Sequence, residues 1–139
     1  MSKELLILIV VGVLILAGFI SLFTLRLKNR RNLPDKFRVK WLEIQRLCAS
    51  KETWKLAVVN ADKLLDNALK KKRLKGKSMG ERIVAAQRSL TDNDGVWYAH
   101  NLAKKLKAES STTLREAQVK KSLVGIRQAL RDLKVLNGK

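Results

Sequence analysis

The only histidine in the chain, His100, is the first residue to weigh for chemistry. It lies four residues after Val96 and three before Ala103, on the apolar side of a predicted helix. A catalytic imidazole needs a nucleophile or a second acid–base group beside it, and no nucleophile motif accompanies His100. The spacing therefore favours a partly buried, hydrogen-bonded histidine over a catalytic one.

Carboxylates are the next candidates. Asp62 and Asp66 are one helical turn apart, and the lysines around them indicate ordinary surface pairing. Asp92 and Asp94 precede Gly95, but the bidentate Glu and the twelve-residue frame of a calcium loop are missing, so we interpret them as helix caps. No cluster of His, Cys and carboxylates has metal-ligand spacing, and we predict neither a metal nor a cofactor.

Two further motifs carry little chemistry. Gly76-Lys77-Ser78 resembles the end of a phosphate loop, but Lys71 stands where the upstream glycine belongs and no strand precedes it. Cys48 is the only cysteine, which excludes an internal disulfide and a cysteine-based zinc site. On a helix, such a residue is typical of packing rather than of a nucleophile.

Lysine and arginine give the strongest remaining signal. The chain holds 30 of them against 12 acidic residues, a formal net charge of +18. Such a surplus is typical of proteins that bind a polyanion, although a proteome-wide basic bias is an alternative. Lys120 and Lys121 form one small group of cations. The aromatic residues Trp41 and Trp54 lie on apolar helix stripes, so they are expected in the core rather than beside the cations. The candidate anion-binding residues are Lys70, Lys71, Lys72, Arg73, Lys75, Lys77, Lys104, Lys105 and Lys107.

An apolar segment near the N-terminus predicts where in the cell these basic residues lie. Residues 5–25 carry no charge, and as a helix they extend about 32 Å, close to the thickness of the hydrocarbon core of a bilayer. A cleavable signal peptide needs a basic start, a shorter core and a small-residue cleavage site, but Phe19, Leu22 and Phe23 stand near the end of this run. We therefore expect an uncleaved transmembrane helix.

Charge on either side of the run predicts its orientation. Lys3 and Glu4 balance each other before it, and many cations follow it, so the C-terminal part is expected in the cytoplasm, at the inner cell membrane. The predicted domains are a short extracytoplasmic N-terminus (1–4), the span (5–25), a basic juxtamembrane linker (26–35) and a cytoplasmic helical bundle (36–139). Candidate contacts to lipid headgroups are Arg26, Lys28, Arg30 and Arg31.

The cytoplasmic part has helical periodicity throughout. A turn is predicted at residues 32–35 around Pro34, followed by helices over 37–48, from about 50–53 to 73, and from Ser78, whose capping box with Glu81 starts a short third helix. A fourth begins within 91–94, and a fifth spans about 113–136 with a capping box of Thr113 and Glu116. Because no segment alternates with period two, the predicted fold is all-α, a compact bundle of four to five amphipathic helices.

Three stretches together resemble a known group. They are residues 54–66, 77–82 and 94–100, and they resemble small bacterial helical proteins, often membrane-anchored, whose bundle is similar to HEPN domains. Active HEPN ribonucleases carry an Arg-x4–6-His motif at a dimer cleft. The matching positions here are Ala103 and Ala108, and His100 matches an earlier histidine. The resemblance thus implies a bundle whose catalytic motif is degenerate.

These observations favour a single-pass membrane protein with a basic, non-enzymatic binding or scaffold module. Its expected partners are anionic membrane lipids, with RNA or an acidic protein as alternatives; a homo-oligomer is left open, and no small-molecule substrate is evident. One alternative function is an HEPN-like ribonuclease or toxin-system component using Trp97, His100 and Lys104. The other is an accessory subunit of a membrane protein complex.

Overall fold

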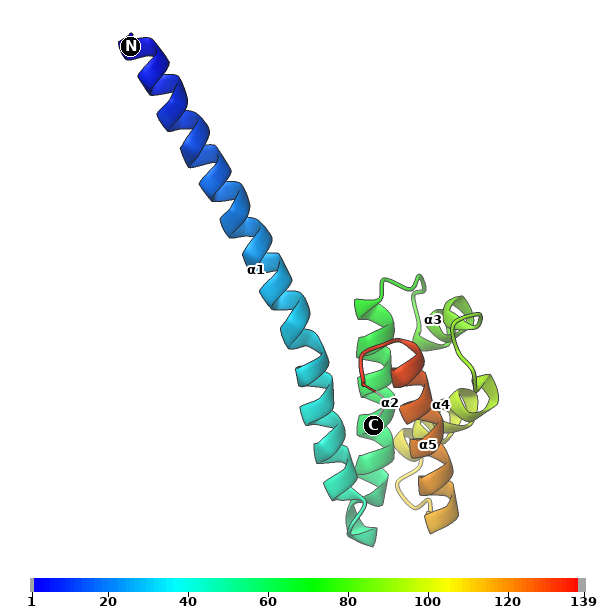
Figure 1. The fold of residues 1–139 in the computed structure, drawn as a ribbon. Coiled ribbons are helices and arrows are strands. Elements are labelled where there is room, and N and C mark those ends of the chain that lie inside the picture. Colours follow the sequence, from blue (N-terminus) through cyan, green and yellow to red (C-terminus); the bar gives the residue numbers. More distant parts are fainter. Residues whose placement is uncertain (1, 138–139) are drawn as a thin grey trace. The chain divides into compact units, whose positions relative to one another are not determined.

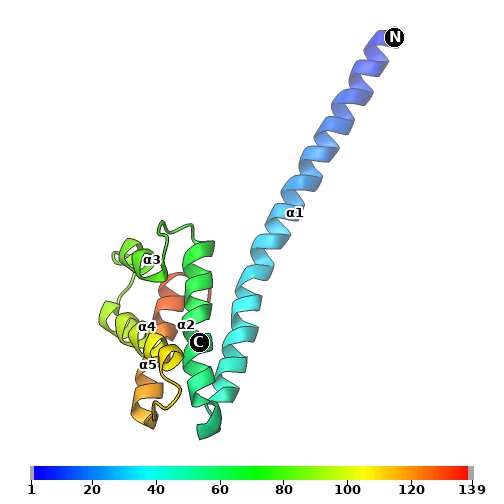
Figure 2. The ribbon, with the colours of Figure 1, turned by 180° about the vertical axis from the view of Figure 1, so that it is seen from behind.

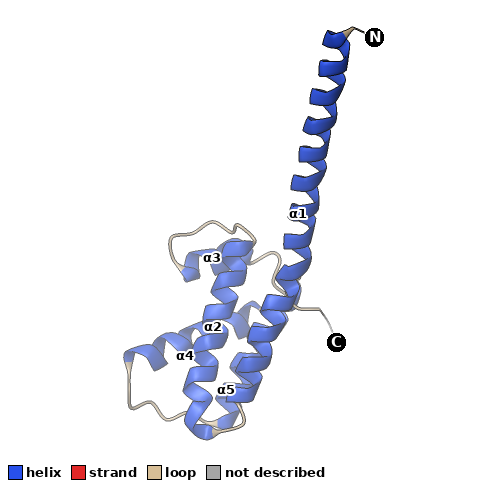
Figure 3. Cartoon of the chain, turned by 90° about the vertical axis from the view of Figure 1, so that its left-hand side faces the viewer, coloured by secondary structure: helices blue, strands red, loops and turns tan. Residues whose placement is uncertain are grey.

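The chain consists of helices joined by short loops in the part that the structure describes. A computed structural model describes residues 2–137, except for the side chains of residues 30–35. Within residues 2–137 there is no strand, so the all-α prediction is confirmed (Figure 3). The helices, labelled in Figure 1, are α1 (Lys3–Leu47), the 3₁₀ turn η1 (Lys51–Thr53), α2 (Trp54–Lys71), α3 (Met79–Ala86), α4 (Asn93–Ala108) and α5 (Glu116–Asp132).

The chain divides into two compact units, Met1–Leu33 and Pro34–Lys139. The first unit contains one helical stretch, Lys3–Asn29, which is long and apolar enough to cross a membrane. Its large apolar side chains are exposed, from 43% at Leu27 to 74% at Phe19, as expected for a surface that meets lipid rather than a protein core. Arg26 and Lys28 are exposed, whereas Arg30 and Arg31 lie outside the residues whose side chains are described.

The predicted turn around Pro34 is wrong. The backbone of α1 is helical through residues 32–35, and the helix ends only at Leu47. Proline removes one backbone N–H from the helix interior, at a cost of about 3 kcal/mol. The helical preference of the segments on both sides outweighs that loss, so the proline does not end the helix here.

The second unit is built around α2. Figures 1 and 2 show α2 and α5 side by side, with α4 crossing them and the short α3 beside α2. The end of α1 also belongs to this unit, since Phe37, Trp41 and Ile44 are all buried. The apolar stripes predicted for the five helices face this common core. Its fully buried large side chains are Leu65, Leu69, Ile83, Leu106, Ile126, Leu130, Val58, Val96 and Val135.

Two of the predicted helix starts are confirmed. Ser78 caps α3 by accepting a hydrogen bond from the Glu81 amide at 3.2 Å, and Asp92 caps α4 by accepting one from the Gly95 amide at 2.9 Å. Such caps satisfy amides that have no partner within the helix.

The predicted start of α5 is wrong. The capping position is Arg115 rather than Thr113, and the Gln118 side chain accepts a hydrogen bond from the Arg115 amide at 2.9 Å. Leu114 explains the shift, because its side chain is buried in the core while its backbone is still outside the helix. The chain therefore reaches the core two residues before α5 begins.

Two glycines determine how closely α4 and α5 approach each other. A Cβ atom on Gly125 would lie 2.7 Å from the backbone carbon and oxygen of Gly95, far inside van der Waals contact. Only glycine at position 125 permits this approach. The position of α4 in the bundle thus depends on a residue in the middle of α5.

Candidate anion-binding surface

The first predicted cluster forms a well-defined loop at the end of α2. We call residues 70–77 the basic loop; it leaves α2 and leads to α3 (Figure 1). The turn is made by Arg73, whose φ of 58° is left-handed, and the Leu74 amide donates a hydrogen bond back to the Leu69 carbonyl at 3.1 Å. This pattern closes the helix end by satisfying its last carbonyls.

Arg82 fixes the basic loop to the bundle. This arginine is only 8% exposed, and its guanidinium lies 2.7 Å from an Asp66 carboxylate oxygen and donates to the Gly76 carbonyl at 2.9 Å. Lys70 pairs with the other Asp66 oxygen at 2.9 Å. One planar guanidinium therefore ties the last turn of α2 to the middle of the loop, a bridging geometry that suits arginine.

The charge of Asp66 depends on this network. Partial burial alone would raise the pKa of Asp66, but hydrogen bonds and charge from Lys70 and Arg82 outweigh it and leave the pKa below its ordinary value. Glu81 adds a further contact, because its carboxylate accepts a hydrogen bond from the Lys77 amide at 2.6 Å. The loop is thus held at its beginning, middle and end.

The cations of the basic loop point outward. All of its lysines and Arg73 are exposed. Among the described residues, Lys70 is the member of the loop that forms an ion pair, through Asp66. The remaining cations are displayed together without an acidic partner, as an anion-binding surface requires.

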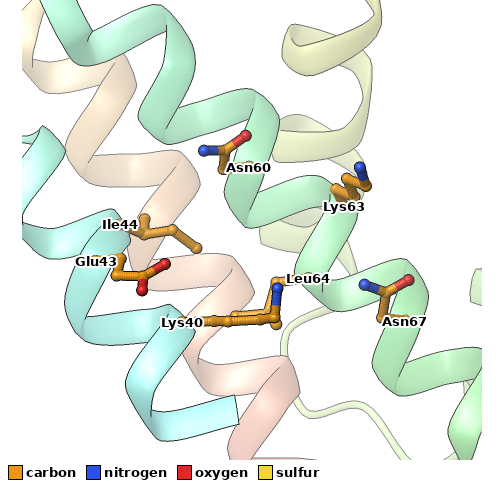
Figure 4. Close-up of a pocket in the computed structure, with 7 residues that line it drawn as sticks. All are labelled: Lys40, Glu43, Ile44, Asn60, Lys63, Leu64 and Asn67. Atoms are coloured by element: carbon orange, nitrogen blue, oxygen red, sulfur yellow. The ribbon is translucent and has the colours of Figure 1, made fainter. Parts of the chain in front are cut away.

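A polar groove extends this surface along α2. Asn60, Lys63 and Asn67 recur at helical spacing toward Lys70, and together with Lys40 from α1 they line a groove of about 170 Å³ (Figure 4). The Lys40 side chain extends from α1 toward Leu64 of α2 (Figure 4). The lysines and amides of the groove offer hydrogen-bond donors to an anion, and Glu43 is the acidic residue in the same lining.

The second predicted cluster lies elsewhere. Lys104, Lys105 and Lys107, the α4 cluster, are exposed in the last turns of α4. That end of α4 packs through Leu106 against Val58, near the beginning of α2, whereas the basic loop follows the end of α2. Val58 and the loop are separated by about 20 Å along the helix. The structure therefore does not bring the two clusters together into one site.

Most of the acidic residues take part in hydrogen bonds within the bundle or lie in the first turn of a helix. Asp132 accepts hydrogen bonds from Thr91 at 2.8 Å and from Gln128 at 3.0 Å, which lower its pKa against the opposing effect of burial. The first turns of η1, α3, α4 and α5 hold Glu52, Glu81, Asp94 and Glu116, where the helix dipole favours negative charge. Most of the described acids are thus at helix ends or in buried bonds, and Glu43 of α1 is an exposed exception.

The prediction of surface pairing for Asp62 is wrong. Asp62 is 3% exposed, and its carboxylate lies 3.0 Å from Nδ1 of His100, which is itself 8% exposed. A carboxylate only accepts hydrogen bonds, so Nδ1 of His100 carries the proton. His100 is thus a buried, partnered histidine, as its place on the apolar stripe predicted. The crossing of α2 and α4, which sequence spacing does not reveal, makes this pair.

The aromatic residues Trp97 and Tyr98 in the first half of α4 point in two directions. Trp97 packs against Gly80 of α3 and contacts His100 edge to face, with ring centroids 6.1 Å apart. Tyr98 lies under the Lys121 ammonium, 4.2 Å from its ring centroid. Both rings are half-buried and engaged by the bundle. Neither forms an open platform for stacking a nucleic acid base.

Sequence reasoning missed the role of Arg82. Arg82 reads as one more cation, and only its contacts identify it as the residue that positions the basic loop. Sequence reasoning also did not single out Val124, although an apolar residue off the core stripe of α5 is visible in the sequence. The structure shows this residue to be 59% exposed.

Comparisons of the chain with protein-family models, with curated proteins and with solved structures gave no match.

Proposed function

We propose that the chain is a single-pass membrane protein whose helical bundle binds anionic phospholipid headgroups through the basic loop. The span would lie in the inner cell membrane with the bundle on the cytoplasmic side, following the excess of cations after residue 25. RNA and an acidic protein are the alternative anions. The observation that carries the proposal is a loop held in place by Arg82 and Asp66, whose exposed cations other than Lys70 form no ion pair among the described residues.

The short separation between the predicted span and the bundle in the sequence supports a lipid ligand. The helical stretch able to cross a membrane ends at Asn29, and the bundle begins at Pro34. A bundle tethered by so few residues remains near the bilayer surface. Lysines near an anionic leaflet contribute about 1 kcal/mol each, so a few loop residues are enough for a strong preference.

The surroundings of the loop favour recognition by charge. Binding to single-stranded RNA without sequence preference uses exposed aromatic rings beside the cations. Trp97 is half-buried against Gly80 and His100, and the indole of Trp54 donates to the Cys48 carbonyl at 3.0 Å. Phosphate groups need only the exposed ammonium groups that the loop supplies.

The test uses the fragment 34–139, which contains the whole core of the second unit. It is titrated with phosphatidylcholine vesicles containing about 30% phosphatidylglycerol, with pure phosphatidylcholine vesicles, and with an oligouridine RNA, each at several salt concentrations. The proposal predicts salt-dependent binding to the anionic vesicles alone. Preferential binding to the RNA would instead assign the loop to nucleic acid, and binding to neither would favour an acidic protein partner.

The enzymatic alternative has one supporting observation. Asp62 orients His100 through Nδ1, as a carboxylate does in many acid–base sites. The burial of these residues argues against an active site. His100 is 8% exposed, and Ala103, which matches the arginine of the HEPN motif, is fully buried. We therefore propose that the bundle is not an enzyme. An RNA cleavage assay with His100→Gln tests this, because activity that depends on His100 would favour the HEPN-like ribonuclease.

A further inference from the structure

An apolar groove lies beside the outer face of α5. It is enclosed by the end of α1 and the beginning of α2 on one side and by α5 on the other, with a volume of about 470 Å³. Its apolar lining comes from Trp41, Trp54, Val119, Leu123 and Val124. Val124 is 59% exposed, although the rest of the outward face of α5 is largely polar. Exposed apolar surface of this kind marks interaction sites in soluble domains.

Trp41 is one of the apolar lining residues, and it is only 6% exposed. Its indole Nε1 is buried and donates no hydrogen bond within the described chain. Because this atom is covered, Trp41 contributes apolar surface to the groove rather than an open donor.

The rim of the groove is predominantly positive. Lys120 and Arg127 line it one turn and three turns after Glu116, which is the acidic residue among the lining residues. From Glu116 to Arg127 the groove follows α5 for about 17 Å, or three helical turns. That length fits the i, i+3 or i+4, i+7 side chains of one docked helix.

We propose that this groove binds an amphipathic helix of a partner protein, with apolar residues on one face and acidic residues beside them. The apolar residues cover Val124 and Leu123, and the acidic residues pair with Lys120 and Arg127. This surface is separate from the basic loop, so the inference goes beyond lipid binding and does not depend on it.

Other occupants fit less well. A second copy of this chain brings its own strong positive charge, and most of its few acids lie at helix ends or in buried hydrogen bonds. A nucleic acid base needs an open aromatic face, whereas only 6% of Trp41 is exposed. An acidic amphipathic helix satisfies the apolar lining and the cationic rim together.

The experiment uses the full chain in phosphatidylcholine nanodiscs and a fluorescein-labelled synthetic helix of about 14 residues, with leucines at i, i+3, i+7 and i+10 and glutamates between them. Anisotropy gives its affinity for the wild type, for Val124→Glu, and for the matched control Val84→Glu. Val84 lies on α3 and is 58% exposed, so the control carries the same change of charge at the same exposure. A peptide of identical composition in shuffled order controls for bulk charge.

We expect Val124→Glu to weaken binding by at least about tenfold and Val84→Glu by less than about twofold, with the shuffled peptide at least about tenfold weaker on the wild type. Equal affinities for the two variants, or for the two peptides, would overturn the proposal. It would also fail if Val124→Glu weakened binding of an oligouridine RNA instead, since the groove would then serve nucleic acid.

Discussion

The basic loop and the α4 cluster have similar composition but different structural origins. Lys70 and Lys71 of the basic loop lie in the last turn of α2, and its other cations follow that helix end, which Arg82 ties to the loop through Asp66 and the Gly76 carbonyl. The lysines of the α4 cluster occupy the last turns of a regular helix, where the helix dipole alone favours positive charge. The α4 cluster thus has a sufficient structural explanation, whereas the loop displays more cations than its fold requires.

The comparison teaches that the number of lysines in a segment does not identify a binding site. What separates the two clusters is the set of contacts that holds each one: the Arg82 network for the loop, and the close approach of Gly95 and Gly125 for α4. Breaking each set of contacts in turn tests whether the two clusters are independent.

The largest effect is expected from Gly125→Ala. The added Cβ would lie 2.7 Å from the Gly95 backbone and force α4 away from α5, at a cost of about 3 kcal/mol in the free energy of unfolding. Urea unfolding of the fragment 34–139, followed by circular dichroism, measures it. The control is Gly80→Ala, whose Cβ meets the Trp97 ring at an ordinary 3.5 Å, and which is expected to leave stability unchanged or raised. Similar losses for both would refute the close packing of α4 on α5.

The next effect is that of Arg82→Ala. Removing the guanidinium leaves the half-buried Asp66 carboxylate and the Gly76 carbonyl without their partner, and we expect a loss of about 2 kcal/mol. Amide hydrogen exchange should accelerate across residues 72–77 and not in α4. Arg82→Lys should recover only part of the loss, because an ammonium group cannot reproduce the two-sided contact. If the exposed control Arg88→Ala costs as much, Arg82 does not hold the loop.

A smaller effect concerns pH. Asp66 and Asp132 both have a pKa below the ordinary value, because hydrogen bonds to their carboxylates outweigh the effect of burial. A carboxyl group whose pKa is lowered on folding stabilises the folded state above its unfolded pKa, and this contribution is lost as the pH falls. Stability should therefore decrease below about pH 4. Asp66→Asn should reduce this decrease, and an unchanged pH profile would show that the carboxylate contributes nothing.

The smallest effect is a gain in stability. Arg73 and Lys134 both have a φ of 58°, a conformation that costs a residue with a side chain about 1 kcal/mol relative to glycine. Lys134→Gly, outside both clusters, should raise the free energy of unfolding by about 0.5–1 kcal/mol. Lys134→Ala serves as the control, since alanine bears the same backbone cost and should give no gain. A destabilised glycine variant would contradict the left-handed turn.

Much of the fold follows from the sequence because apolar spacing is a local signal. The stripe of α5 places Val119, Ile126 and Leu130 in the core, and the caps Ser78 and Asp92 start their helices as predicted. The ends of the helices were harder to predict from the sequence where contacts with distant residues determine them. Leu114 is drawn into the core and delays α5, and the helical segments on both sides of Pro34 override its usual effect.

The candidate sites depend on contacts that no local pattern encodes. Asp62 meets His100 because α2 and α4 cross, at a separation of 38 residues in the chain. Arg82 meets Asp66 because α3 folds back beside α2. The positions of the cations were predictable, but which cluster is held as a loop was not.

The central claim is that the basic loop, rather than total charge, binds the anionic membrane surface. Its most direct test compares two fragments of equal net charge, one with Lys71→Gln, Lys72→Gln and Lys75→Gln and the other with Lys104→Gln, Lys105→Gln and Lys107→Gln. Partitioning onto vesicles with about 30% phosphatidylglycerol should fall by at least about tenfold for the loop variant and by less than about threefold for the α4 variant. Equal losses for the two variants would contradict the claim and leave a diffuse attraction of the whole bundle in its place.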